Sequence, residues 1–481
     1  MRTKVKTKKM LLAGNWVLSN KWIDVVNPQN NSLIAKVPSA SREEMLLAIE
    51  KADEAFKKTK TWSTHERIEI LTKAADYMAD NAEKYAKTIS LEGSKTITEA
   101  RGEVKRAIQT IKISAEEARR INGETISFDQ REGSENRLGY YYRFPIGVVA
   151  AITPFNDPLN LVAHKIGPAI ASGNAIVVKP ASVTPLSALL LAEAFVEAGL
   201  PKGFLSVITG SGREVGDVLV THPKIKMVSF TGGLETGEKI AHQAGLKKVN
   251  MELGSNSPVI VLGDANIDEA VSASVSGAFS AVGQNCIGVQ RIFVEKDMYD
   301  PFLKKFITEA DKLVVGDKMD ERTDVGPLIN EKEARRVEDW VEEALDQGAK
   351  LQLGGKREGA YYEPTVLTEV PESAKIAKEE IFGPVVLITP VNDLSEAIDR
   401  SNDVNFGLQA GIFTNDINKA FYTIKNIEVG GIIVNDSSDY RIDAMPFGGI
   451  KGSGLGREGV RSAIESMTEP KVVCFNLDAR F

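Results

Sequence analysis

The chain has 481 residues, of which 43% are hydrophobic, 26% charged and 7% aromatic. This composition predicts a globular protein of two or three folded units and excludes a disordered or fibrous chain. With 59 basic and 66 acidic side chains the net charge is -7, so the sequence gives no reason to expect binding to nucleic acid.

The N-terminal stretch MRTKVKTKKM is basic, like the start of a signal peptide. Only residues 11–13 follow with apolar side chains before Gly14, so we expect a solvated tail instead. No segment approaches the ~20 apolar residues that cross a bilayer. Two cysteines in the whole chain are typical of a reducing compartment. We therefore predict a cytoplasmic protein that associates with no membrane.

Residues 41–121 have the periodicity of helices. Ser41 and Glu44 have the spacing of a capping box, and Met45, Ile49, Ala52 and Phe56 then recur on one helical face. A polar break follows near Gly123. Residues 138–143, LGYYYR, are then expected to form a strand that leaves the body of the domain.

Short apolar runs alternate with helices in the next part of the chain. The runs lie at 146–153, 174–180, 204–209, 227–232 and 247–254. This alternation predicts a parallel sheet covered on both faces. Between the second and third runs, Thr184 is expected to cap a helix that has Pro185 in its first turn and ends at Gly199.

A second α/β series begins at 258–262 and continues to about residue 435. It contains an expected helix over 263–279 and an expected strand over 290–295, with Cys286 between them in the stretch GQNC. The other cysteine, Cys474, lies in an apolar run and is expected to be a buried strand residue. The histidines form no HExxH motif or Cys/His cluster, so we predict no metal site.

Two glycine-rich turns follow expected strands and precede expected helices, as in dinucleotide-binding sites. Residues 210–216 have a spacing one residue longer than G-x-G-x-x-G. Residues 230–233 hold paired glycines that would let a pyrophosphate approach a helix N-terminus. Either turn could equally be an ordinary one without a ligand. Lys179 closes an apolar strand, where it could reach a ribose or phosphate or be a plain surface lysine.

Several separate motifs occur in the order found in the aldehyde dehydrogenase superfamily, which the chain resembles over nearly its whole length. They are ITPFNDPL at 152–159, MELGSNSP at 251–258, GQNC at 283–286, EEIFGP at 379–384 and MPFGGIKGSGLGREG at 445–459. The resemblance implies an α/β fold with a Rossmann-type parallel-sheet NAD(P)-binding domain, an α/β catalytic domain and a small β extension for oligomerisation. The expected bounds are 1–122 with 145–253, then 254–466, and 123–144 with 467–481.

In that family the thiolate at the position of Cys286 attacks the aldehyde carbon, and the resulting thioester is hydrolysed to a carboxylate. The resemblance assigns Asn156 and the backbone N–H of Cys286 to the oxyanion, and Glu252 to the base. Acylating members that use coenzyme A generally lack this glutamate. A catalytically silent binding or structural protein would be expected to have lost one of the three residues. A cysteine hydrolase would need a histidine partner for Cys286, and no local motif provides one.

The resemblance also implies NAD or NADP as cofactor. Ser182 stands where many NAD-preferring members have a glutamate that repels the 2'-phosphate, so NADP is admissible. Gly233 replaces a serine that often binds phosphate, and Ser255 replaces a glycine beside Glu252. The expected cofactor-binding residues are Thr153, Pro154, Phe155, Lys179, Ser182, Gly212, Gly216, Phe230, Thr231, Gly232, Gly233, Leu253, Glu380 and Phe382.

The substrate region is expected to contain Arg106, Asp157 and Arg441. Two guanidinium groups could bind a carboxylate, phosphate or sulfonate, or each could be a surface arginine with an acidic neighbour. Asp157 could bind a hydroxyl group or pair with an arginine. The chain is most similar to the lactaldehyde, non-phosphorylating glyceraldehyde-3-phosphate and succinate-semialdehyde dehydrogenase branch. We therefore predict that the protein oxidises a small hydroxylated or anionic aldehyde. The β extension predicts a homodimer or homotetramer.

Overall fold

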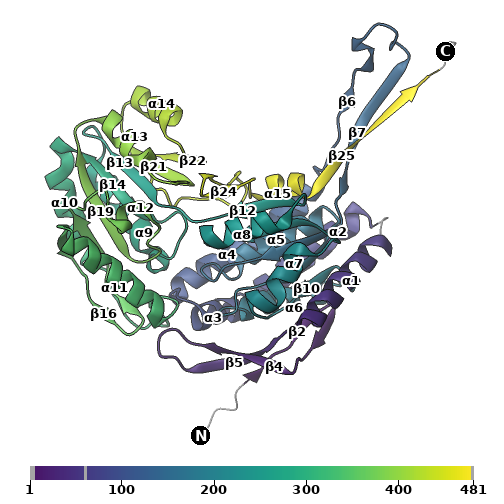
Figure 1. Cartoon of the computed structure of the whole chain (residues 1–481), viewed down its shortest axis with the longest axis horizontal. Coiled ribbons are helices and arrows are strands. Elements are labelled where there is room, and N and C mark those ends of the chain that lie inside the picture. Colours follow the sequence, from purple (N-terminus) through teal and green to yellow (C-terminus); the bar gives the residue numbers. More distant parts are fainter. Residues whose placement is uncertain (1–5, 59–61, 478–481) are drawn as a thin grey trace.

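The computed structural model describes residues 6–58 and 62–477. These residues form two α/β lobes and a three-stranded sheet that projects from the body of the molecule (Figure 1). Among the described helices, none is both long and apolar enough to cross a membrane.

The N-terminal part combines a small sheet with four helices. The small sheet has the order β1-β5-β4, with β1 (Lys6–Thr7), β4 (Lys21–Val26) and β5 (Leu33–Ser39). The helices are α1 (Arg42–Lys58), α2 (Thr64–Asp80), α3 (Ala82–Glu92) and α4 (Ile97–Ala118). The predicted capping box is confirmed, because Ser41 N donates to Glu44 Oε2 over 2.8 Å and Glu44 N donates to Ser41 Oγ over 3.3 Å.

The first lobe is built on an eight-stranded sheet, β24-β12-β11-β8-β9-β10-β2-β3. Its strands are β2 (Met10–Leu12), β3 (Asn15–Val17), β8 (Val148–Ile152), β9 (Ala175–Lys179), β10 (Leu205–Val207), β11 (Ile225–Thr231), β12 (Lys248–Glu252) and β24 (Gly454–Leu455). The strands from β12 to β10 in this order are parallel, as the apolar runs predicted.

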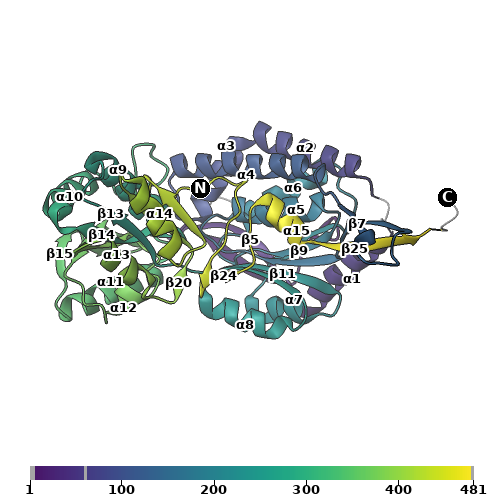
Figure 2. The ribbon, with the colours of Figure 1, turned by 90° about the horizontal axis from the view of Figure 1, so that it is seen from above.

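Helices cover both faces of this sheet, which Figure 2 shows edge-on. One layer contains α2, α3, α4, α5 (Asn160–Ala171) and α6 (Leu186–Glu197), and the other contains α1, α7 (Asp217–Thr221) and α8 (Leu234–Ala244). The apolar strands are buried between the layers, which explains why their sequences do not alternate with polar residues.

The cap predicted for α6 is wrong. The helix begins after Pro185, and the side chain of Thr184 is buried with no hydrogen-bond partner among the described residues. Its first N–H groups are instead satisfied by Glu92, whose carboxylate accepts from Leu186 N and Ser187 N, each over 2.7 Å. Gly199, with φ +84°, ends the helix as expected.

The second lobe has a seven-stranded sheet, β15-β18-β19-β14-β13-β21-β22, in which only β15 is antiparallel to its neighbour. The strands are β13 (Ser257–Val261), β14 (Val289–Glu295), β15 (Lys350–Leu353), β18 (Thr365–Thr368), β19 (Val385–Val391), β21 (Gln409–Phe413) and β22 (Gly431–Val434). The helices are α9 (Ile267–Phe279), α10 (Lys296–Ala310), α11 (Glu331–Asp346), α12 (Lys375–Lys378), α13 (Leu394–Asn402) and α14 (Ile417–Asn426).

Two short antiparallel strand pairs complete the second lobe. They are β16 (Arg357–Glu358) with β17 (Tyr361–Tyr362), and β20 (Phe406–Gly407) with β23 (Ile450–Lys451). The helix expected over 263–279 and the strand expected over 290–295 are confirmed by α9 and β14.

The projecting sheet consists of β6 (Thr125–Ile126), β7 (Arg137–Pro145) and β25 (Thr468–Asn476), all antiparallel (Figure 1). The strand expected at 138–143 is confirmed by β7. Cys474 lies in β25 as expected, but the prediction that it is buried is wrong because it is exposed. Val472 and Phe475 in the same strand are exposed as well.

After the second lobe the chain returns to the first. β24 pairs with β12, placing Gly454 opposite Glu252. α15 (Val460–Ser466) packs on α4 and α5, and Val460 belongs to the core of the first lobe. The expected catalytic domain extended to 466, whereas the packing places these last elements with the first lobe. The return brings the MPFGGIKGSGLGREG stretch beside the end of β12.

Candidate active site

Cys286 follows a strained turn after α9. Ala281 and Val282 have φ angles of +51° and +53°, a left-handed conformation that is costly for a β-branched residue. At Gly283, with φ +68°, a side chain would collide with the backbone of Gly383. Beyond the turn, Cys286 packs against the apolar cluster that contains Phe447. The turn therefore fixes the position of the thiol beside that cluster.

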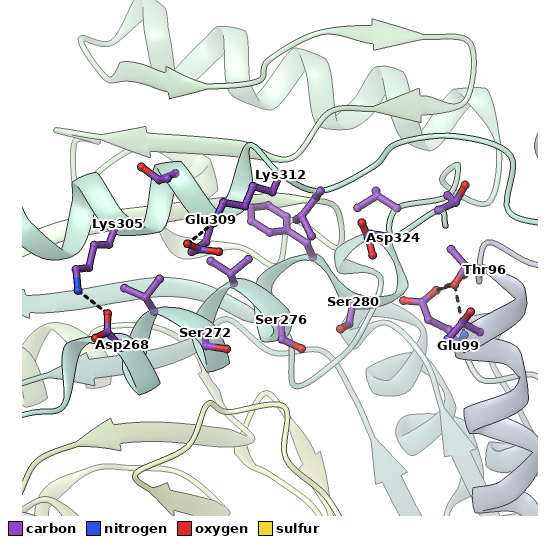
Figure 3. A pocket seen from close by; sticks show the side chains of 18 of the residues that line it. Thr96, Glu99, Asp268, Ser272, Ser276, Ser280, Lys305, Glu309, Lys312 and Asp324 are labelled. Carbon is purple, nitrogen blue, oxygen red and sulfur yellow. Dashed lines mark hydrogen bonds and ion pairs between the residues drawn. The ribbon is translucent and has the colours of Figure 1, made fainter. Parts of the chain in front are cut away.

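The start of α4 holds this turn in place. Glu99 Oε1 accepts from Ala281 N over 2.6 Å, and Ser94 Oγ donates to Gln284 Oε1 over 2.8 Å. Glu99 also completes a capping box with Thr96. Thr96 and Glu99 border a cavity of about 1030 Å³ between α9, α10 and α4 (Figure 3). Side-chain hydrogen bonds thereby link the turn before Cys286 to the first lobe.

The charges around Cys286 have opposing effects on its thiol. Burial raises the pKa of Cys286 to about 12, and the nearby carboxylates of Glu380, Asp157 and Glu252 raise it too, whereas Arg441 lowers it. At neutral pH the thiol therefore keeps its proton in the free chain. Formation of a nucleophilic thiolate requires a base close to the sulfur.

Glu252 ends β12 and is the carboxylate that the motifs predicted as a base. Its residue exposure is 3%, and neither carboxylate oxygen has a hydrogen-bond partner among residues 6–58 and 62–477. Burial and the charge of Glu458 raise its pKa well above the ordinary value, against the opposing effect of Lys165. A side chain on Gly448 would lie 3.0 Å from Glu252 Oε1, so the glycine leaves room at this carboxylate.

A buried ion pair lies next to Glu252. Lys165, in α5, pairs with Glu458, and both side chains are 1% exposed. Burial raises the pKa of Glu458, but Lys165, His164 and Arg441 together outweigh it and hold the pKa at about 2. Glu458 therefore remains ionised and disfavours ionisation of Glu252, which makes it, after burial, the second cause of the raised pKa of Glu252.

Asn156 and Asp157 follow β8 in the turn of the ITPFNDPL motif. Both are partly buried. The ring of Phe155 packs edge-on against Phe382, with 5.8 Å between centroids, and so brings this turn next to the EEIFGP motif. Asp157 forms an ion pair with Lys95, a residue that the sequence motifs did not indicate.

The two predicted substrate arginines differ in what they contact. Arg106 donates from Nη2 and Nε to the two oxygens of Asp443, over 3.0 and 3.3 Å. Asp443 also accepts from Asn160 Nδ2 over 3.0 Å and lies 2.8 Å from His164 Nε2. These cationic and donor partners hold the pKa of Asp443 below its ordinary range, although burial raises it. Arg106 is thus already paired within the chain.

Arg441 is the arginine with free donors. Its side chain is 6% exposed and lies over the ring of Phe447, 3.7 Å from the centroid. Its Nε and Nη2 have no hydrogen-bond partner in the described part of the chain, and Glu458 is 3.6 Å away. Arg441 is also close enough to Cys286 for its charge to lower the pKa of the thiol, so a guanidinium with two donors that make no hydrogen bond within the described ranges lies near the sulfur. A buried donor set of this kind is suited to an anion.

Two predicted cofactor residues lie at the carboxyl end of β9, next to the turn that follows β10. Lys179 is 6% exposed, its Nζ donates only to the backbone oxygen of Pro180 over 3.2 Å, and burial lowers its pKa to about 8. Ser182 Oγ donates to the oxygen of Gly210 over 3.0 Å and so joins the two turns. The glycine-rich stretch continues as a π-helical turn from Gly212 to Gly216.

The second glycine-rich turn connects β11 to α8. Gly233 precedes the first residue of the helix, and a side chain there would meet nothing within 4 Å. The Oγ1 atoms of Thr153 and Thr231 are buried without a hydrogen-bond partner in residues 6–58 and 62–477. The start of α8 is therefore uncovered, as an anion-binding helix N-terminus needs to be.

Glu380 lies across from this edge of the first sheet. Its Oε1 accepts from Ser255 N over 2.8 Å, and burial raises its pKa to about 7. The serine that departs from the family motif thus presents its backbone N–H to Glu380. A carboxylate here and the buried amine of Lys179 fit the hydroxyl groups of two riboses, so the residues present fit a nicotinamide dinucleotide.

The comparisons with known proteins agree with this arrangement. A model of the aldehyde dehydrogenase family matches residues 16–473. The chain belongs to the aldehyde dehydrogenase family. It is 48% identical to a 3-sulfolactaldehyde dehydrogenase of Priestia aryabhattai over 475 residues, which are 99% of each chain. The predicted family, fold class and NAD(P)-dependent oxidoreductase class are thereby confirmed.

Two solved structures are also similar to this aldehyde dehydrogenase. Aldehyde dehydrogenase 21 of Physcomitrella patens, in complex with the reaction product succinate, is 42% identical, with a TM-score of 0.97 and 100% of each chain covered. A glyceraldehyde-3-phosphate dehydrogenase of Methanocaldococcus jannaschii, complexed with NADP, is 43% identical, with a TM-score of 0.92, over 95% of this chain and all of the other.

Several charged residues near the site of this aldehyde dehydrogenase were not found from the sequence. They are Lys95, His164, Lys165, Asp443 and Glu458. Only Glu458 lies in a quoted motif, and the pairs they form join segments as far apart as Arg106 and Asp443. Within the described ranges, no group of three His, Cys, Asp or Glu side chains is placed to hold a metal ion.

Proposed function

We propose that this aldehyde dehydrogenase oxidises a small hydroxylated or anionic aldehyde to its carboxylic acid and that it accepts NADP. The observation that carries the anionic part is Arg441, a buried guanidinium near Cys286 whose Nε and Nη2 make no hydrogen bond among the described residues. The printed names of the relatives, which include a 3-sulfolactaldehyde dehydrogenase, support the same class of substrate. Succinate, bound in the plant structure, is also a small anion.

The catalytic roles follow from the chemistry of the three residues. Cys286 passes its proton to a water molecule beside the sulfur as Sγ attacks the aldehyde carbon, and the amide of Asn156 with the backbone N–H of Cys286 stabilises the alkoxide. NADP+, when bound, supplies the two-electron acceptor that the oxidation needs. Glu252 takes a proton from the water that hydrolyses the thioester on Cys286. Its raised pKa suits this role, because a carboxylate with a raised pKa is a stronger base than an ordinary one once it is ionised.

The cofactor would be held between the lobes. We propose that Lys179 binds the adenosine ribose, that Glu380 binds the nicotinamide ribose and that Phe382 packs beside the nicotinamide. The uncovered N-terminus of α8 at Gly232 and Gly233 would receive the pyrophosphate through backbone N–H groups. We also propose that the remaining predicted residues contact the cofactor, because they lie along the same edge of the first sheet. They are Thr153, Pro154, Phe155, Gly212, Gly216, Phe230, Thr231 and Leu253.

Cofactor preference is testable at Ser182. We expect Ser182→Glu to lower kcat/KM for NADP by about 10- to 100-fold, with little change for NAD, because a carboxylate there would repel the 2'-phosphate. Initial rates with both cofactors at a saturating aldehyde concentration measure the effect. Ser182→Ala is the matched control, since it removes the bond to Gly210 without adding charge. Equal losses for NADP and NAD would contradict the placement of Ser182 at the 2'-phosphate.

Anion recognition is testable at Arg441. We expect Arg441→Met to lower kcat/KM for succinic semialdehyde by about 10- to 100-fold, the range of hydrogen bonds to charged groups, and to affect propanal much less. Arg461→Met is the control for loss of an arginine, because that side chain is 71% exposed. An equal loss with both aldehydes would show that Arg441 supports the fold or the thiol and does not bind the anionic group.

The assembly and location of the enzyme belong to the same proposal. We propose a cytoplasmic homodimer or homotetramer in which the projecting sheet is the oligomerisation extension, the first lobe binds NAD(P) and the second carries the nucleophile. The exposed apolar side chains of this sheet, among them Leu138, Val472 and Phe475, support a covering partner chain. Two free cysteines in the whole chain fit a reducing compartment.

A further inference from the structure

A partly buried ion pair lies directly beside the residue proposed to bind the aldehyde oxygen. Asp157 follows Asn156 in the chain and pairs with Lys95, which precedes α4. The side chain of Lys95 is 10% exposed and that of Asp157 is 17% exposed. Neither the family motifs nor the catalytic steps above use Lys95.

The hydrogen bonds of this pair leave groups free on both partners. Lys95 Nζ has three N–H donors, and it donates to Glu103 Oε2 over 2.8 Å and to Asp157 Oδ1. Glu103 Oε1 accepts from the backbone N–H groups of Leu159 and Asn160, over 2.8 and 3.0 Å, so this carboxylate is fully used at the start of α5. One donor of Lys95 and Asp157 Oδ2 have no hydrogen-bond partner among the described residues.

The surrounding charges fix what this pair can bind. Asp157 faces Lys95, Arg106 and Arg441, and although burial raises its pKa, these cations outweigh it and keep the carboxylate ionised. Arg106 is neutralised by Asp443, and Glu103 is bound to Lys95. An ionised carboxylate repels an anionic group of a substrate, and an apolar group would leave Oδ2 without a partner.

We propose that Asp157 and Lys95 form a subsite for a hydroxyl group on the substrate carbon next to the aldehyde. A hydroxyl group is the small substituent that both donates, here to Asp157 Oδ2, and accepts, here from Lys95 Nζ. The position follows from two observations, because Asp157 is next to Asn156 in the chain and lies close enough to Cys286 for its charge to act on the thiol.

This subsite rests on the proposed function and makes it more specific. With Arg441 as the anion site, the substrate would bind with its hydroxyl group at Asp157 and any anionic group at Arg441. A site whose buried polar groups bind a substrate hydroxyl discriminates against the analogue that lacks it, because those groups are then left unpaired. The partial exposure of Asp157 allows water to replace part of the loss, so a moderate factor is expected.

The test compares 2-hydroxypropanal, 3-hydroxypropanal and propanal as substrates of the full-length enzyme. For the wild type we expect kcat/KM for 2-hydroxypropanal to exceed that for propanal by about 10- to 100-fold, with 3-hydroxypropanal closer to propanal. Asp157→Asn and Lys95→Met should reduce this ratio to about 3-fold or less. Because both aldehydes are measured on one preparation, a smaller folded fraction cancels from the ratio.

Glu321→Gln is the matched control, since it removes a carboxylate that is 68% exposed, and it should leave the ratio unchanged. A wild-type ratio near 1, or an unchanged ratio in Asp157→Asn, would overturn the subsite while aldehyde oxidation itself stands. Failure of the proposed function is a different result, in which wild-type enzyme oxidises none of these aldehydes and no anionic aldehyde with either cofactor.

Discussion

Cys286→Ala is expected to abolish the formation of NADPH with every aldehyde, with a loss of at least about 10⁴-fold in kcat/KM. The Cys286 thiol is the nucleophile that adds to the aldehyde carbon. No other described residue near Cys286 is a nucleophile of comparable strength. The strained turn from Ala281 to Gly283 and the apolar packing around Phe447 position this one sulfur. The rise in NADPH absorbance measures the loss.

Cys474→Ala is the control for this substitution. Cys474 is exposed on β25, far along the projecting sheet, so its removal should leave kcat/KM unchanged. A Cys286→Ala enzyme that keeps more than about a tenth of wild-type activity would contradict the covalent mechanism. Thermal unfolding of both variants separates a lost nucleophile from a lost fold.

Glu252→Gln is the second substitution with a large expected effect. General base catalysis contributes about 10²- to 10⁴-fold, so steady-state turnover should fall by that factor. The first turnover should be affected less, because NADPH forms before the hydrolysis step in which Glu252 acts. A burst of NADPH should therefore precede the slow phase. Stopped-flow absorbance under pre-steady-state conditions resolves the two phases.

The pH dependence of turnover also tests the assignment of Glu252 as the base. Burial and Glu458 raise the pKa of Glu252, and a base acts only when it has lost its proton. Turnover of the wild type should therefore rise with pH through this raised pKa, and the rise should be absent from the slow phase of Glu252→Gln. Wild-type turnover by Glu252→Gln would rule out the base. Rapid formation of acyl-coenzyme A by the wild type would instead favour the acylating alternative.

Much of the fold was predictable because its signals are local. The apolar runs that became β8, β9, β11 and β12 lie between helical layers, and burial on both faces leaves a continuous hydrophobic pattern. The cap of α6 was not predictable, because Glu92 reaches it from a helix early in the chain. Cys474 was misjudged because an apolar strand usually lies in a core, whereas β25 belongs to a sheet outside it.

Site residues could be proposed from the sequence where family motifs mark them. The motifs predicted Cys286, Glu252 and Asn156 as catalytic residues, and the comparisons confirm the family to which those motifs belong. The charged pairs around these residues were not predictable. Lys165 meets Glu458, and Arg106 meets Asp443, only because the chain returns from the second lobe to the first. These contacts decide which arginine keeps donors without a hydrogen bond among the described residues and which carboxylate has a raised pKa.

Trapping of the thioester tests the central claim most directly. Glu252→Gln enzyme is mixed with NADP and 2-hydroxypropanal, quenched in acid within the burst and digested, and its peptides are measured by mass spectrometry. The account predicts that the peptide containing Cys286 gains the mass of one 2-hydroxypropanoyl group and that the peptide containing Cys474 gains none. An adduct elsewhere, or none during a burst of NADPH, would contradict it.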